Sequence, residues 1–379
     1  MHRLAQGYFV YELTGSAFWV GAIDALTAAP LLFFSLFAGI ILDRFPKRDV
    51  LRMAQFCQFI LGTTLGVLVL TDHASLLSLG IIGFLNGCVA AVDQPARFAL
   101  PIDLVGKRDL HAAYALNMST VHIARILGPA LGGFLIAGFG VGWAFLLNGL
   151  SFLAPLITFS LIRFPRFAPQ KPERMLESIM HGIRYVAGHV EMRLLLTYLI
   201  VFGLFGWSYT TMLPVFASDI FALGPSGLGL LFSAAGTGTV LGGFLISALS
   251  RLPFNPHRIV IFGSLTYAIS LFLFTLHPWF AIALFLLFCV GFGQAFQNST
   301  IHTRVQMLCA DEMRGRVSSI QSVTLQGMQS IGSFQVGILA SYVGPQVAVG
   351  AGALIMLVSA MALYRKLPRI PSSRVFHRV

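Results

Sequence analysis

One stretch of 36 residues contains both features that decide the fold, a long apolar run and a basic cluster directly after it. From residue 17 to residue 52 it reads AFWVGAIDALTAAPLLFFSLFAGIILDRFPKRDVLR. Residues 17–42 carry one charged side chain, Asp24, and a helix of roughly 20 apolar residues crosses a hydrocarbon core of about 30 Å. Basic residues gather in loops on the cytoplasmic side of a membrane. The stretch therefore predicts a transmembrane helix that ends at the cytoplasm.

The composition of the whole chain agrees with this stretch. Of 379 residues, 56% are hydrophobic and 10% are charged, and the mean hydropathy is +0.82. Soluble domains carry about 25% charged residues, and here too few charges remain to cover a soluble chain of 41.2 kDa. We therefore expect a polytopic membrane protein and exclude soluble enzymes, soluble nucleic-acid binders and disordered chains.

Apolar runs between charged and Pro/Gly clusters predict eleven complete spans, and residues 3–13 resemble the end of one more. The eleven spans are 17–42, 50–71, 76–96, 112–137, 142–162, 194–217, 226–249, 258–276, 279–300, 317–341 and 345–364. A polar stretch over 163–193 separates two groups of spans. Its segment 173–193 has apolar residues at helical spacing, which predicts an interfacial or cytosolic helix.

The basic residues show the orientation of these spans. Of the 25 Lys and Arg residues, 23 lie in alternate connections, in the central stretch and in the tail, and the other connections contain none. The positive-inside rule places the loops that carry these basic residues, and the C-terminus, in the cytoplasm. The net charge of +11 is thus a signal of topology, and we expect no nucleic-acid partner. The expected location is the bacterial cytoplasmic (inner) membrane.

The two groups of spans repeat each other at an offset of 204 residues. Five glycine pairs agree with this offset: Gly39/Gly243, Gly87/Gly291, Gly128/Gly332, Gly133/Gly337 and Gly140/Gly344. Lys47 pairs with Arg251 at the same offset. Tandem six-helix halves are the parallel-repeat plan of one large class of transporters, so the repeat favours a transporter over a receptor or a membrane enzyme. The offset also places about half of the first helix before Met1, which predicts an internal methionine and a truncated start.

The expected organisation follows from the spans and the repeat. Residues 1–163 form an N-terminal bundle with a partial first helix, and 164–192 form a cytosolic linker with an amphipathic helix. Residues 193–366 form a C-terminal bundle, and 367–379 form a basic cytosolic tail.

Several kinds of chemistry have no sequence support. The four cysteines stand singly in apolar runs, which indicates neither disulfides nor a metal site. The pattern GxxxxGK[ST] of nucleotide-binding loops does not occur. We therefore expect no enzyme, no metal and no cofactor.

The loop after the first complete span resembles a family signature. Residues 39–48 read GIILDRFPKR, similar to G-x-x-x-D-R-x-G-R-R of the major facilitator superfamily, with Pro46 in place of the usual glycine. The similarity continues through DQPAR at 93–97, ARILGPALGG at 124–133, FLLNGLSF at 145–152 and DEMRGRV at 311–317. Together these segments resemble the bacterial subgroup of enterobactin exporters and transmembrane secretion effectors, over essentially the whole chain.

This resemblance implies an all-α fold of two six-helix bundles related by a pseudo-twofold axis, with the first helix incomplete here. It implies export of a small molecule, usually driven by the proton gradient. We expect a monomer in the lipid bilayer. Uptake or facilitated diffusion stays an alternative, as does a non-transporting membrane protein or an inactive truncated transporter.

Candidate latch residues come from the signature loop. Asp43 would face the N-terminus of the helix that begins near Arg314 and hold the outward-facing state. Simple positive-inside anchoring is the alternative. The predicted latch consists of Gly39, Asp43, Arg44, Lys47, Arg48 and Arg314.

Charged residues within spans are the candidates for proton coupling or substrate contact. Arg125 lies about 13 positions into its helix, where a charge costs roughly 2.5–3.5 kcal/mol, so it needs a partner in the bundle interior, with Asp24 and Asp93 as candidates. Asp24 suits a proton carrier because a low dielectric raises the pKa of a carboxyl group. For Asp93 we favour a structural pair with Arg97. His122 lies one turn before Arg125. It either changes its protonation state or packs as a hydrogen-bonded side chain.

Two further sets of residues have weaker assignments. Gly128, Pro129, Gly132 and Gly133 resemble the signature of proton-coupled antiporters, and small residues allow close helix packing while proline permits a bend. Polar uncharged residues near the end of the chain line a cavity or join helices. These are Gln297, Asn298, Gln326 and Gln329.

Overall fold

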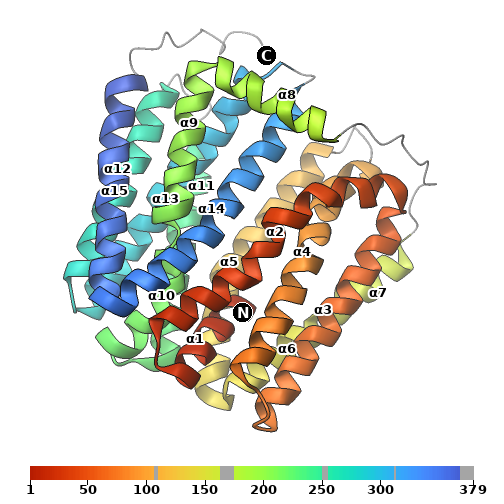
Figure 1. The fold of residues 1–379 in the computed structure, drawn as a ribbon, viewed down its shortest axis with the longest axis vertical. Coiled ribbons are helices and arrows are strands. Elements are labelled where there is room, and N and C mark those ends of the chain that lie inside the picture. Colours follow the sequence, from red (N-terminus) through yellow and green to blue (C-terminus); the bar gives the residue numbers. More distant parts are fainter. Residues whose placement is uncertain (106–109, 163–174, 250–254, 311–312, 368–379) are drawn as a thin grey trace.

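The structure is a computed structural model that describes residues 1–105, 110–162, 175–249, 255–310 and 313–367. In these ranges every regular element is a helix. The N-terminal half, coloured red to yellow in Figure 1, lies beside the C-terminal half, coloured green to blue. The predicted all-α architecture is confirmed.

The N-terminal half contains seven helical segments. They are α1 (His2–Thr14), α2 (Ala17–Arg44), α3 (Lys47–Leu70), α4 (Leu76–Val105), α5 (Leu110–Phe139), α6 (Val141–Ser151) and α7 (Leu153–Leu161). The predicted span 142–162 is divided between α6 and α7, which meet at Phe152.

The C-terminal half follows the helix α8 (Met175–Gly188). Its elements are α9 (Val190–Val201), η1 (Phe202–Gly206), α10 (Tyr209–Val215), η2 (Phe216–Ile220), α11 (Gly224–Leu249), α12 (Pro256–Leu276), α13 (Phe280–Leu308), α14 (Arg314–Val343) and α15 (Pro345–Lys366). The predicted span 194–217 corresponds to one membrane-spanning segment that consists of α9, η1, α10 and η2. Its two π-helical segments, η1 and η2, contain one extra residue per turn, a feature that often marks functional positions.

Nine of the eleven predicted spans are long and apolar enough to cross a membrane within the described ranges. The other two, 112–137 and 317–341, correspond to α5 and α14, each 30 residues long. Both helices pack against the opposite half, where polar side chains need not face lipid.

The glycine pairs of the repeat occupy equivalent places in the two halves. Gly140 and Gly344 precede α6 and α15 with nearly the same backbone, φ 89° and ψ 163° against φ 83° and ψ 159°. Residues with a Cβ rarely adopt such a positive φ. Gly87 packs against the backbone of α2, and Gly291 packs against the backbone of α11. The repeat predicted from the sequence is thus present in the packing.

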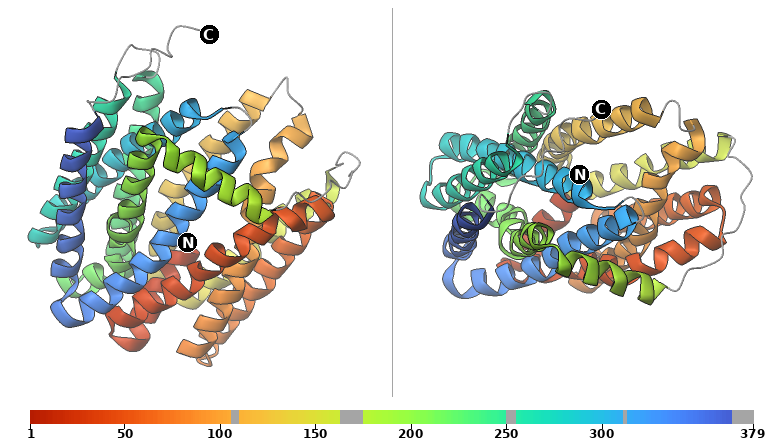
Figure 2. Two further views of the ribbon diagram at one scale, coloured as in Figure 1. Left: turned by 45° about the horizontal axis from the view of Figure 1, so that its top comes forward. Right: turned by 90° about the horizontal axis from the view of Figure 1, so that it is seen from above.

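Two glycine contacts join the halves. A Cβ added to Gly21 of α2 would lie 2.7 Å from Cα of Gly337 on α14, and one added to Gly133 of α5 would lie 2.7 Å from Cα of Gly229 on α11. Gly133 and Gly337 are mates in the repeat, so the two crossings are related by the pseudo-symmetry. Figures 1 and 2 show α2 beside α14 near the end of the bundle opposite α8.

The helix α8 lies across the ends of the bundle in Figure 1. A Cβ added to Gly182 would lie 2.7 Å from Ile320 on α14, and Val186 is also buried. Met180 and Ile183 on α8 are exposed. The described part of the predicted linker is therefore a helix with one face packed against α14, at the end of the bundle where α9 begins.

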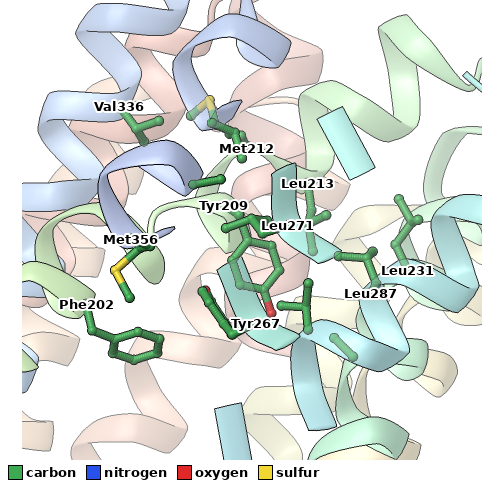
Figure 3. Close-up of a cluster of buried hydrophobic side chains, with 14 of the residues drawn as sticks. Phe202, Tyr209, Met212, Leu213, Leu231, Tyr267, Leu271, Leu287, Val336 and Met356 are labelled. Atoms are coloured by element: carbon green, nitrogen blue, oxygen red, sulfur yellow. The ribbon is translucent and has the colours of Figure 1, made fainter. Parts of the chain in front are cut away.

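The largest fully buried side chains include several in the C-terminal half. Figure 3 shows Phe202, Tyr209, Tyr267 and Met356 among aliphatic neighbours. The hydroxyl of Tyr267 donates to the carbonyl of Gly206, 2.6 Å away. This bond satisfies a carbonyl of the π-helical segment η1 and holds the segment from α9 to η2 against α12.

Candidate functional site

The carboxylate of Asp24 is the centre of a polar cluster within the membrane-spanning region. Arg3 of α1 binds it with two nitrogens: Nε donates to Oδ1 over 3.0 Å and Nη2 donates to Oδ2 over 2.7 Å. The side chain of Asp24 is 17% exposed and that of Arg3 is 45% exposed. A two-pronged bond of this kind fixes both groups in orientation as well as in distance.

Two hydroxyl groups of the opposite half also bind Asp24. Thr211 of α10 donates to Oδ2 over 2.9 Å, and Ser333 of α14 donates to the same oxygen over 2.7 Å. The two hydroxyl oxygens lie 3.0 Å from each other. Asp24 therefore joins the halves directly, and hydrogen bonds to a carboxylate are stronger than neutral ones.

Other bonds surround this cluster at the same end of the molecule. Ser330 donates to the carbonyl of Ala25 over 2.9 Å, and Tyr11 donates to the carboxylate of Asp219 over 2.5 Å. Both bonds run between the halves. A small cavity beside Asp24 has a mixed polar and apolar lining that includes Arg3, Gln6, Val20, Thr211, Pro214 and Phe232.

Protonation of Asp24 would act together on its bonds to Arg3, Thr211 and Ser333. A neutral carboxyl group loses its charge attraction to Arg3, and its new O–H competes with the donors that now bind Oδ2. One proton thus weakens both the ion pair inside the N-terminal half and the hydrogen bonds to the C-terminal half. This is the chemical requirement for coupling proton binding to movement of the halves.

The candidate partners of Arg125 have other partners in the structure. Asp24 pairs with Arg3, and Asp93 pairs with Arg97 at 2.7 Å. The side chains of Arg125 and His122 lie outside the described part of the structure. Their proposed roles stay predictions.

Asp93 and Arg97 form the expected i,i+4 pair on α4. Asp93 is 4% exposed, and it also accepts a hydrogen bond of 2.7 Å from Gln55 on α3. Arg97 donates to the other atom of that amide, Oε1 of Gln55, over 3.1 Å. The contacts join α3 and α4 within one half, in agreement with the structural interpretation.

The signature loop is described only in part. The side chains of Gly39, Asp43 and Arg314 lie outside the description, and that of Arg44 is exposed. Arg48 donates to the carbonyls of Phe159 and Ser160 over 3.2 and 2.6 Å, at the end of α7. In this conformation Arg48 therefore binds its own half. Lys47 is half-buried at the start of α3.

The glycine–proline segment of α5 lies partly at the crossing between halves. Gly133 meets Gly229 of α11, and the carbonyl of Pro129 would lie 3.1 Å from a Cβ on Gly229. Gly132 faces the side chain of Met1, and Gly128 lies near the backbone nitrogen of the same residue. The packing interpretation of this segment thus has direct support in these distances.

Of the two alternatives for these amides, Gln297 agrees with the second, which is to join helices. It is fully buried among helices of the C-terminal half and accepts a hydrogen bond of 2.5 Å from the hydroxyl of Tyr198, so it does not line a central cavity. Asn298, Gln326 and Gln329 are half-buried. The sequence shows that α13 and α14 carry amides, but only the packing shows which way each side chain points.

Sequence reasoning did not assign six contributors to polar clusters of the structure. They are Arg3, Thr211, Ser333, Glu191, His257 and Arg304. Nothing in the sequence distinguishes Thr211 and Ser333 from other polar helix residues. Arg3 and Glu191 are charged residues close to predicted spans, and such charges mark candidate functional residues. No group of three or more His, Cys, Asp or Glu residues suited to a metal ion occurs among the residues that the structure describes.

The sequence matches a known family over nearly all of its length. A profile of the transmembrane secretion effectors matches residues 1–376. The enterobactin exporter of Shigella flexneri is 24% identical over 357 residues, which cover 93% of this chain and 84% of that protein. The enterobactin exporter of Escherichia coli O1:K1 is 24% identical over 363 residues, with the same coverage.

Solved transporters share the fold at lower identity. A peptide transporter in complex with alafosfalin has a TM-score of 0.77 at 13% identity, over 97% of this chain and 90% of that one. A mutant form of the nucleoside transporter NupG has a TM-score of 0.76 at 14% identity, over 96% of this chain and 94% of that one. These likenesses establish the fold of the major facilitator superfamily for this chain.

Proposed function

Because this chain belongs to the transmembrane secretion effector family of the major facilitator superfamily, we propose that it exports a small molecule in exchange for protons. Membership makes it a membrane transporter and not an enzyme. Direction, coupling ion and substrate are the proposed part. Alternating access, in which one half rocks against the other around a central site, is the mechanism expected for such repeats.

The single observation that carries the proposal is the set of bonds made by Asp24. A carboxylate bound both by its own half and by hydroxyls of the other half responds to a proton with a change in the contact between halves. We propose that Asp24 is the group that exchanges the proton, and that its protonation state determines how strongly Thr211 and Ser333 hold the outer end closed.

The charge distribution indicates on which side of the membrane the closed end lies. The positive-inside rule assigns the end with α8 and the C-terminus to the cytoplasm, so the crossings at Gly21 and Gly133 belong to the outer side. The described contacts between halves at that side agree with a state open to the cytoplasm. A cytoplasmic substrate would enter this state first.

For the substrate we propose a siderophore or a drug-like compound. The support is the similarity to enterobactin exporters at 24% identity.

Transport into inside-out membrane vesicles tests the proposal. We expect wild-type vesicles with an acidic interior to accumulate labelled enterobactin or the cationic dye ethidium, and a protonophore to abolish the accumulation. D24N should lose gradient-driven accumulation more than tenfold but keep exchange of labelled for unlabelled substrate. The matched control is D49N, because Asp49 is exposed and contacts Arg52 only at 4.0 Å.

Two results would refute the proposal. Full gradient-driven accumulation by D24N would remove Asp24 from the coupling. Accumulation only in right-side-out vesicles would establish uptake instead of export.

A further inference from the structure

Three buried residues of the C-terminal half form a second charged cluster, remote in sequence from Asp24. Arg304 of α13 donates to both oxygens of Glu191 on α9, over 2.6 Å and 3.1 Å. Nε2 of His257 on α12 lies 2.9 Å from Oε1 of the same carboxylate. All three residues are less than a tenth exposed. Neither the latch nor the Asp24 cluster uses them.

A second polar layer lies next to this cluster. Each of the three helices carries a polar residue seven positions further into the membrane, which is about two helical turns and therefore the same face. These residues are Tyr198, Ser264 and Gln297. The hydroxyl of Tyr198 binds Oε1 of Gln297. The two layers together form a polar column inside an otherwise apolar core.

Three side-chain atoms of this column have no hydrogen-bond partner among the described residues. They are Oγ of Ser264 and Nε2 of Gln297, both in fully buried residues, and Oγ1 of Thr300, a residue that is 9% exposed. Thr300 lies on α13 between Gln297 and Arg304. Buried polar atoms are nearly always bonded, and ordered water commonly completes them. The column therefore has sites for water next to the charged cluster.

We propose that Glu191, His257 and Arg304 form a proton-binding site of the C-terminal half, in which the imidazole of His257 takes the proton. Nε2–H donates to Glu191 in the neutral tautomer and in the imidazolium alike, so the proton adds at Nδ1 without breaking this bond. Glu191 accepts hydrogen bonds from the imidazole and from Arg304, so both groups share its negative charge. The role in the transport cycle rests on the proposed proton exchange, whereas proton binding itself does not.

The charges around His257 make the site depend on Glu191. Arg304 and the N-terminus of α12, which begins at Pro256, both disfavour a positive imidazole. Among the described residues, Glu191 lies at hydrogen-bond distance from His257, and Arg304 binds the same carboxylate. Other basic residues on the helices that pack here are exposed: Arg184, His189, Arg193, Arg258, Arg365 and Lys366.

Nuclear magnetic resonance of the full chain in lipid nanodiscs tests the site directly. The chain has ten histidines, and labelled imidazoles report their protonation state. We expect the signal that disappears in H257Q to change from the neutral to the protonated form between pH 8 and pH 5. If that signal stays constant over the whole range, the cluster is a structural clamp only and the proposal is wrong.

A second variant keeps the assignment possible if H257Q does not fold. Y198F leaves all three charged residues in place, and the imidazole signal that it shifts identifies His257. Because this titration needs neither substrate nor gradient, it holds or fails independently of proton-coupled export. D24N should leave it unchanged.

The transport role has its own test. In inside-out vesicles, gradient-driven accumulation by H257Q should lose its dependence on cytoplasmic-side pH between pH 6 and pH 8. H189Q, which changes an exposed histidine after α8, should keep the wild-type profile. A wild-type profile in H257Q would overturn the role of the site in the cycle.

Discussion

At the scale of single residues, the function proposed here depends on side chains that meet only in the folded chain. Asp24 is visible in the sequence as the one charge in the run 17–42, and its chemistry marks it as a candidate. Its partners Arg3, Thr211 and Ser333 come from three other helices. No periodicity or spacing connects them, because these contacts depend on helix packing.

Removing one hydroxyl from Asp24 tests the closure between halves. We expect S333A to weaken the closed outer end by about 1 kcal/mol, the usual net value of one hydrogen bond, which changes the populations about fivefold. Distances between spin labels at positions 72 and 277, in a chain with its four cysteines replaced, should show more of the outward-open state.

The matched control for this experiment lies on the same helix. Ser341 donates to the carbonyl of Ile338 on α14 and makes no described bond to the other half. S341A should leave the distance distribution unchanged. Equal effects of S333A and S341A would contradict the closing role of Ser333.

Removing the carboxylate of Glu191 tests the buried cluster of the C-terminal half. E191A leaves Arg304 and His257 buried without their acceptor, and breaking a buried ion pair in this way costs about 3–5 kcal/mol. We expect a melting temperature lower by roughly 5 °C or more for the purified protein. D49N, which alters an exposed pair, should melt like wild type.

At the scale of elements, glycines determine how closely the helices of opposite halves approach. Gly133 and Gly337 are repeat mates, and each meets a glycine of the other half, Gly229 and Gly21 respectively. The sequence indicated the repeat through these glycines. It could not indicate the partner glycines, because the helices that carry them, α2 and α11, are a different repeat pair from α5 and α14.

A single methyl group at this crossing tests the packing. In G133A the new Cβ would lie 2.7 Å from Cα of Gly229 and from the carbonyl oxygen of Pro225, and such overpacking typically costs about 1–3 kcal/mol. The outer end should therefore open more often, which the same label pair measures. G138A changes the same helix where no atom lies within 4 Å of the new Cβ, and it should have no effect. Identical distance distributions in the two variants would mean that the crossing does not control closure.

At the scale of the whole molecule, the positions of basic residues determine the expected orientation. We predict that alkaline phosphatase fused after His73 is active, because that connection lies outside the membrane barrier. The same enzyme fused after Val379 should be inactive, whereas green fluorescent protein fused there should fluoresce. The reverse pattern would invert the membrane orientation and with it the assignment of the closed end.

The sequence by itself determined the membrane class, most of the spans, the expected orientation, the repeat and the family. These follow from local properties: hydropathy over about 20 residues, the charge of each loop, and motifs within single segments. Even the turns before α6 and α15 were marked by Gly140 and Gly344, since their positive φ requires glycine.

Only the tertiary structure decided which charges meet. Arg3 pairs with Asp24, Gln297 turns into the C-terminal half, and Glu191, His257 and Arg304 converge from three helices. The physical reason is that a helix determines the spacing of its side chains along one axis, whereas the packing of neighbouring helices determines which face is buried. An ion pair between helices requires both.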